Sequence, residues 1–245
     1  MNPTSGVIGE GWQLYKAHWR HLITFSFVVY AGVAVIGAVL TLLLSWFGAI
    51  LAAIISLVAF FWLQAALVKA VDDVRDGRAD LSLGDTFEQA REKLSSVAVA
   101  AILAGLGIVV GLVLLIVPGL VLMTWWAVII PVVVLEKRSA GEAFTRSREL
   151  VRGNGWGVFG VIVLMLLLLI GFEIVLSLLL TPLTHWLRSF VSQIVSGTLT
   201  APFVATVLTL LYFRLHAAKE PAPAAETPPP DAPAAATPPP DAPAA

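Results

Sequence analysis

The sequence predicts an all-α integral membrane protein with six transmembrane helices, arranged as three repeated units. The chain has 245 residues, of which 58% are hydrophobic and 13% are charged. A soluble domain is nearer about 45–50% apolar and about 25% charged. The excess of apolar residues lies in uninterrupted runs, and a similar short charged segment precedes each pair of runs. Together these observations predict three units, each a surface helix followed by a membrane hairpin.

The short segments share one pattern, in which an acid follows a glycine, an aromatic residue comes three positions after the glycine, and a base comes seven after it. The segments begin at Gly9, Gly84 and Gly141. Apolar residues spaced three and four apart in them predict helices with one apolar face. Such helices suit the headgroup boundary of a bilayer. In the second and third copies, Ser82 and Ser139 stand three residues before the acid, which predicts a capping box.

Six apolar runs are candidates for membrane spans, because about 20 apolar residues cross about 30 Å of hydrocarbon. The fourth is the shortest and contains Pro131. Pro118-Gly119 predicts a tight turn between the third and fourth spans. Residues 45–48 form a short connection, and 181–192 are expected to form a longer outer loop. The predicted spans are residues 22–44, 49–68, 96–117, 119–135, 156–180 and 195–215.

The basic residues predict the orientation of these spans. Of the 15 Lys and Arg residues, only Arg188 falls in a connection on the outer side. Cytoplasmic loops carry the excess of Lys and Arg. We therefore expect both termini to be cytoplasmic, which requires an even number of crossings.

Residues 217–245 differ in composition from the rest of the chain. They are rich in Pro and Ala, and Thr-Pro-Pro-Pro-Asp-Ala-Pro-Ala-Ala occurs twice. Such a segment cannot bury a core, so we expect an extended, disordered cytoplasmic tail with polyproline-II character.

Aromatic and basic residues of the three short segments are candidates for contact with membrane lipids or with a protein partner. The alternative is that these helices only anchor the chain or pack on the spans. No feature indicates nucleic-acid binding. The candidate contact residues are Trp12, Lys16, Trp19, Arg20, Phe87, Arg91, Phe144, Arg146, Arg148 and Arg152.

Glu173 is the only acid inside an apolar run. A carboxylate in hydrocarbon is costly, so an intramembrane acid is a candidate functional group that could carry a proton or contact a cation. The alternative is a protonated or paired structural carboxyl with Ser177, His185 or Arg188 as neighbours.

The aspartates between residues 72 and 85 are candidates for a Mg²⁺ site in phosphate transfer, namely Asp72, Asp73, Asp76, Asp80 and Asp85. Asp73-Val74-Arg75-Asp76-Gly77 resembles the start of the signature of phospholipid-head-group alcohol phosphotransferases. The Ala-Arg pair and the further acids of that signature are missing, so a solvated loop is favoured. The chain has no cysteine, no His-Glu-x-x-His, no Gly-x-Ser-x-Gly and no phosphate loop. The sequence therefore predicts no catalytic site, no metal and no cofactor.

Several motifs resemble a family of bacterial polytopic proteins, the membrane domain of glycerophosphoryl diester phosphodiesterase. They are Pro118-Gly119, Trp125, the run from Pro131 to Glu136, Ala143–Ser147, Leu150–Gly153 and Trp156, together with Gly9–Trp19 and Gly77-Arg78. The resemblance covers about residues 5–216 and implies a bacterial cytoplasmic membrane protein. In some members a soluble phosphodiesterase barrel carries the catalysis. No His-Arg-Gly motif occurs here, so the resemblance carries over no catalytic residues.

The sequence favours a non-enzymatic membrane scaffold or lipid-associated assembly factor. Two alternatives stay open: a small transporter or lipid-moving protein that uses Glu173, and a lipid-head-group enzyme that uses residues 72–85.

Overall fold

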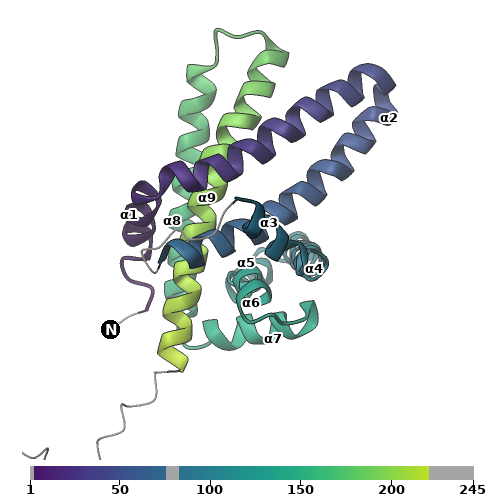
Figure 1. Ribbon diagram of the computed structural model, residues 1–245. Helices are drawn as coiled ribbons and strands as arrows, with labels where there is room; N and C mark the ends of the chain where they lie inside the picture. The colour runs from purple at the N-terminus through teal and green to yellow at the C-terminus, as the bar shows by residue number, and fades with distance from the viewer. Residues whose placement is uncertain (1–2, 76–82, 221–245) are drawn as a thin grey trace, which may run out of the picture.

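The computed structural model describes residues 3–75 and 83–220, and these residues form helices without a strand. The all-helical prediction is confirmed. The helices, shown in Figure 1, are α1 (Val7–Ala17), α2 (Trp19–Arg75), α3 (Leu83–Arg91), α4 (Leu94–Leu114), α5 (Ile116–Trp125), α6 (Ile129–Leu135), α7 (Ala140–Val151), α8 (Gly155–Leu179) and α9 (His185–Lys219).

Five helical stretches of the described chain are long and apolar enough to cross a membrane: α2, α4, α5 with α6, α8 and α9. The 57 residues of α2 contain two of the predicted spans. The backbone leaves helical geometry at Ser45, where φ is 50°, and the chain folds back there (Figure 1). Gly48 lies so close to the backbone of Leu40 that a Cβ would not fit. The two arms of α2 therefore form the first predicted hairpin.

The second hairpin turns at Leu115, whose extended backbone (φ −156°, ψ 126°) separates α4 from α5. The predicted turn at Pro118-Gly119 is wrong, because both residues lie in the first turn of α5. Proline fits there, since the first N–H groups of a helix have no intrahelical partner. Gly111 and Gly119 bring the two helices close, and a Cβ on Gly111 would lie 2.9 Å from the Cα of Gly119.

The predicted fourth span is not one continuous helix. α5 ends at Trp125 and α6 begins at Ile129. Pro131 lies in the first turn of α6, where its missing N–H removes no helical hydrogen bond. In an unbroken helix the same proline would remove one and would clash with the preceding turn. The chain therefore breaks just before it.

The third hairpin joins α8 to α9 through a shorter connection than expected. The predicted outer loop at 181–192 is helical from His185 onward, with Thr184 as the N-cap. α9 then runs for 35 residues with Pro202 inside it. One turn after this proline, the Oγ1 of Thr206 donates a hydrogen bond to Pro202 O at 2.7 Å.

Short helices precede each hairpin: α1, α3 and α7. The capping box of α7 is confirmed. Ser139 N–H donates to Glu142 Oε2 at 3.0 Å, and Glu142 N–H donates to Ser139 Oγ at 3.5 Å. The second predicted box needs Ser82, which lies outside the described residues.

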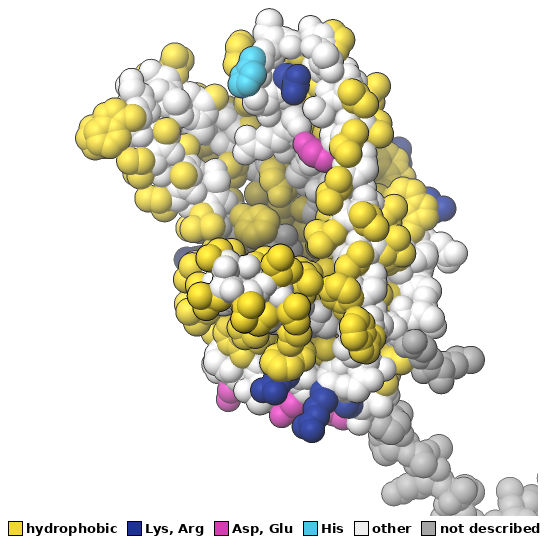
Figure 2. All heavy atoms as spheres, turned by 180° about the vertical axis from the view of Figure 1, so that it is seen from behind, with side chains coloured by type: hydrophobic (Ala, Val, Ile, Leu, Met, Phe, Trp, Pro, Cys, Tyr) yellow, Lys and Arg dark blue, Asp and Glu magenta, His cyan; other side chains and the backbone are white. Residues whose placement is uncertain are grey.

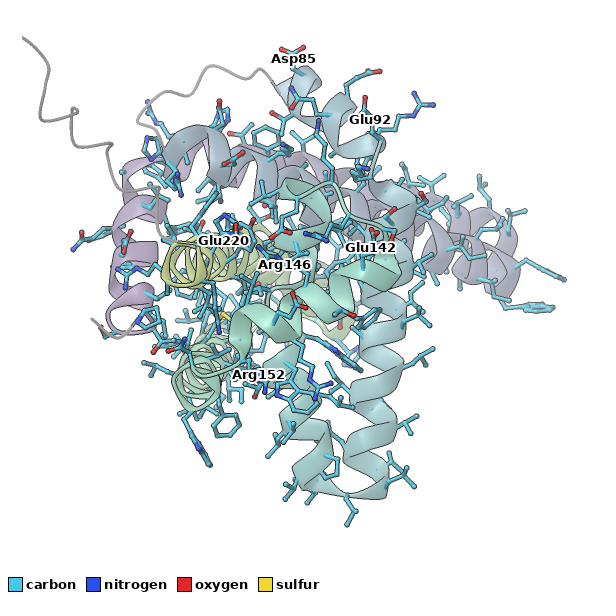
Figure 3. The ribbon with its side chains drawn as sticks, turned by 90° about the horizontal axis from the view of Figure 1, so that it is seen from below. Asp85, Glu92, Glu142, Arg146, Arg152 and Glu220 are labelled. Carbon is cyan, nitrogen blue, oxygen red and sulfur yellow. The ribbon has the colours of Figure 1, made fainter. Side chains whose placement is uncertain are left out.

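Most buried apolar side chains lie at one end of the molecule, here called the base. It consists of α6, α7, the second arm of α2, the first halves of α4 and α8, and the second half of α9. Beyond the base the three hairpins project in different directions (Figures 1 and 3). Their outer halves carry exposed aliphatic side chains, including Leu42, Val113 and Leu179.

Candidate functional site

An apolar crevice of about 560 Å³ lies between α8 and α9, with α1 beside it. Its walls offer almost no polar surface. The hydroxyls of Thr200 and Tyr15 and the indole N–H of Trp12 are the polar side-chain groups among its lining residues. The crevice is lined by Ile8, Gly9, Trp12, Tyr15, Leu168, Leu169, Phe172, Leu199, Thr200 and Phe203.

Three contacts hold α1 against α9 at this crevice. Gly11 allows close approach, since a Cβ there would lie 2.9 Å from Val207 Cγ2. The hydroxyl of Tyr15 donates to Leu199 O at 3.3 Å. Near the base end of α9, Arg214 pairs with Glu10. These contacts fix which face of α1 lines the crevice.

Aromatic rings and one cation form the rim on the side of α1. Trp12 stacks on Tyr15 with ring centroids 5.7 Å apart, and Phe203 meets both rings edge to face at 6.1 Å. Lys16 Nζ lies 5.6 Å from the centroid of the Trp12 ring. Trp12 is 48% exposed, so one side of its ring is open while the other lines the crevice. Two of the predicted contact residues, Trp12 and Lys16, are therefore together at this rim.

Glu173 lies one helical turn beyond the crevice, on the same face of α8 as Leu169. Its Oε1 accepts a hydrogen bond from Ser192 Oγ at 3.2 Å, and its Oε2 accepts one from Ser196 Oγ at 2.8 Å. These bonds join α8 to α9 and form a polar bridge at the outer end of the crevice. Glu173 has serine partners on α9 instead of the expected Ser177, His185 or Arg188.

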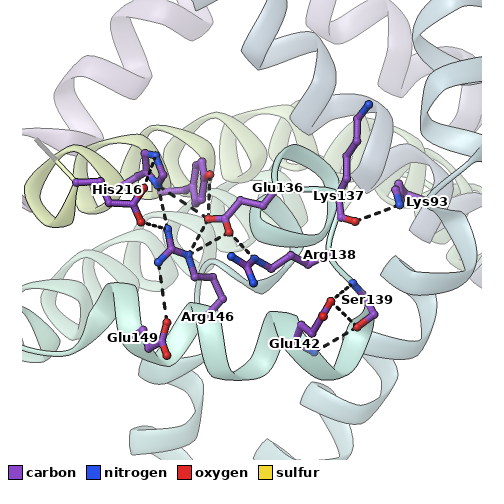
Figure 4. A network of polar contacts seen from close by, with 11 residues as sticks. Lys93, Glu136, Lys137, Arg138, Ser139, Glu142, Arg146, Glu149 and His216 are labelled. Atoms are coloured by element: carbon purple, nitrogen blue, oxygen red, sulfur yellow. Dashed lines mark hydrogen bonds and ion pairs between the residues drawn. The ribbon is translucent and has the colours of Figure 1, made fainter. Parts of the chain in front are cut away.

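A second polar group, the base network, joins α6, α7 and α9 (Figure 4). Arg146 is at its centre. Its Nε lies 3.0 Å from both carboxylate oxygens of Glu136, and its Nη2 lies 2.6 Å from Glu220. Arg138 and Tyr212 also donate to Glu136, at 2.7 and 3.2 Å. The remaining members are Glu149 and His216.

The charges of the base network stabilise one another. Burial alone would raise the pKa of Glu136, but hydrogen bonds from Arg138 and Arg146 outweigh it and hold that pKa below its ordinary value. Burial would likewise lower the pKa of Arg146, but its hydrogen bonds to Glu220 and Glu136 raise it. Both groups stay ionised at neutral pH. Arg146, predicted to contact a lipid or partner, is therefore engaged within the fold.

α7 also covers the break between α5 and α6. Ser147 is fully buried, and its Oγ donates to Trp125 O at 2.8 Å, where α5 ends. The guanidinium of Arg148 lies 4.2 Å from the Trp125 ring centroid. Phe144 meets Trp126 edge to face at 4.9 Å. The predicted contact residues Phe144 and Arg148 thus pack on the end of α5 and on the connection that follows it.

The other predicted contact residues are spread over the surface. Arg20 lies 5.7 Å from the ring centroid of Trp19, which is half exposed. Arg91 and Arg152 are exposed, and Figure 3 shows Arg152 on the side of the molecule viewed from below. The side chain of Phe87 lies outside the described residues.

Of the aspartates between residues 72 and 85, Asp76 and Asp80 lie outside the described residues. Within the described chain no group of three His, Asp or Glu side chains could hold a metal ion.

Sequence reasoning did not select several residues that build these sites. Phe172 and Phe203 lie inside apolar runs, where nothing distinguishes a lining residue from any other. Glu136 carried a usable signal, since it is the first charged residue after a long apolar stretch. Tyr212 and His216 stand one turn apart near the end of the last span, which places both on one helical face.

The fold and these sites define an all-helical chain with several helices able to cross a membrane and an apolar crevice between two of them. No protein-family model, curated protein or solved structure matches the chain.

Proposed function

We propose that this chain is a non-enzymatic, multi-pass protein of the bacterial cytoplasmic membrane that acts as a lipid-associated scaffold. Each of its three units, a surface helix followed by a helical hairpin, begins and ends on the cytoplasmic side. The distribution of basic residues supports this orientation. Figure 2 shows charged side chains gathered along the lower edge of the molecule, below a body covered by hydrophobic side chains.

The apolar crevice carries the proposal. Its volume falls within the range of about 300–1,000 Å³ typical of small-molecule sites. Two of the three helices that line it, α8 and α9, are themselves apolar enough for the membrane, so a lipid acyl chain is the ligand nearest at hand. Lys16 at the Trp12 rim places a cation where the headgroup of a cytoplasmic-leaflet lipid would lie. The polar bridge from Glu173 to α9 limits the crevice at its outer end.

Filling the crevice should displace the lipid. Leu169→Trp adds bulk to its wall, and we expect several-fold less phospholipid to remain bound per protein after a detergent wash, measured by native mass spectrometry. Leu178→Trp is the matched control, because Leu178 is on the same helix, is 69% exposed and does not line the crevice. Equal lipid retention in both variants would exclude the crevice as the lipid site.

A further inference from the structure

The hairpin of α4 and α5 differs from the other two in what its tip presents. Residues 97–123 contain no polar, charged or aromatic side chain. The tip itself is highly exposed: Val113, Leu115 and Val117 have 79%, 67% and 70% of their surface free. No neighbouring helix of the described chain covers these side chains.

The other tips carry groups suited to a membrane–water boundary. Ser45 lies at the turn of α2, and beside it Trp46 stacks on Phe47 with centroids 3.7 Å apart. The connection from α8 to α9 contains Thr184, and Trp186 follows it, 71% exposed. Tryptophan is enriched at the boundaries of bilayers.

The depth that α5 can reach follows from its length. Its inner end is marked by Trp125, which contacts Arg148 of the charged helix α7. From Trp125 back to Ile116 there are ten residues, or about 15 Å at 1.5 Å per residue. That is half of the about 30 Å hydrocarbon thickness. The other half of the predicted span, α6, does not continue this helix, because the chain breaks at residues 126–128, and Val132, Val133 and Val134 of α6 are covered within the base.

The turn also suits an apolar surrounding. Unsatisfied backbone groups are costly in hydrocarbon, and one residue, Leu115, makes this connection. Its N–H donates to Gly111 O at 3.0 Å, and Pro118 brings no N–H to the first turn of α5.

We propose that the α4–α5 hairpin enters the bilayer from the cytoplasmic side and ends near its middle, so that its tip binds lipid hydrocarbon and never reaches the outer water. The chain then makes four crossings with α2, α8 and α9 and carries one re-entrant hairpin. Both ends of that hairpin stay cytoplasmic, which keeps the bias of basic residues intact. This inference rests on the proposed membrane insertion and orientation.

The chain has no cysteine, so single cysteines report on each tip without background. We would introduce Leu115→Cys, Trp46→Cys and Thr184→Cys separately in the full chain and treat intact cells with a membrane-impermeant maleimide. Positions 46 and 184 should react from outside. Position 115 should react neither from outside nor from the cytoplasmic side of opened membranes, but fully after denaturation.

A nitroxide attached at position 115 gives a second readout. We expect its relaxation to respond strongly to oxygen and weakly to a water-soluble nickel chelate, as it should deep in hydrocarbon. If position 115 is labelled from outside as fast as position 46, or is labelled from the cytoplasmic side, the re-entrant hairpin is wrong. The proposed orientation would stand in either case. Failure of positions 46 and 184 to react from outside would overturn the proposed orientation.

Discussion

Among single residues, Arg146 is a mostly buried charge that several carboxylates hold in place. Its side chain is only 14% exposed, and the side chain of its main partner, Glu136, is only 13% exposed. If either partner is removed, the charge of the other stays partly buried without an opposite charge beside it, which destabilises the fold. This explains why a residue selected from the sequence as a surface contact instead joins α7 to α6 and α9.

Replacing this residue should weaken the fold. We expect Arg146→Met to lower the free energy of unfolding by about 2–3 kcal/mol, because Glu136 would keep only part of its hydrogen bonding. Unfolding in mixed micelles, followed by circular dichroism, would measure the change. Arg152→Met is the control and should change little, since Arg152 is exposed and has no ion pair within the described chain. Similar losses in the two variants would contradict the role of the base network.

At the scale of elements, the sequence predicted which segments are helical and where most hairpins lie, but not where helices break. Apolar periodicity and run length identified the long helices, and the Ser139–Glu142 spacing identified the start of α7. Proline was ambiguous: Pro118 and Pro131 each read as a turn or an interior kink, and both lie in first turns. That choice depends on tertiary contacts, such as the bond from Ser147 to Trp125 O.

The break between α5 and α6 should depend on that bond. Ser147→Ala leaves the carbonyl of Trp125 without its side-chain donor, and we expect a loss of about 1–2 kcal/mol in unfolding free energy. The same unfolding experiment would measure it. Thr145→Ala, at an exposed position of α7, is the comparison. Equal losses of unfolding free energy in the two variants, or no loss in Ser147→Ala, would show that α7 does not hold the break through this bond.

At the scale of the whole molecule, the crevice could not be predicted from the sequence. It forms where α1 meets α8 and α9, and α1 is separated from α8 by more than a hundred residues. Its lining residues share no local pattern, and the partners of Glu173 become apparent only once α9 lies beside α8. The apolar content of the spans predicted the membrane environment but not which helices leave a space between them.

The position of α1 should therefore control lipid binding. Gly11→Leu places a side chain where Val207 now packs, so we expect α1 to move off α9 and bound phospholipid to fall several-fold in native mass spectrometry. Gly9→Leu tests bulk at the crevice without that clash, because nothing lies within 4 Å of a Cβ at Gly9. If Gly11→Leu retained its full complement of lipid, the crevice would not require α1 in this position.

α9 is about 52 Å long at 1.5 Å per residue, which exceeds the thickness of the hydrocarbon layer. A rod of this length transmits a tilt at one end as a displacement at the other, unless it bends in between. Pro202 lacks the N–H that would bond across its turn, so the rod is most compliant there. Thr200 and Phe203, which line the crevice, flank that joint. A lipid chain held between them would set the angle of the joint, and so the position of the base at one end relative to the outer tip at the other.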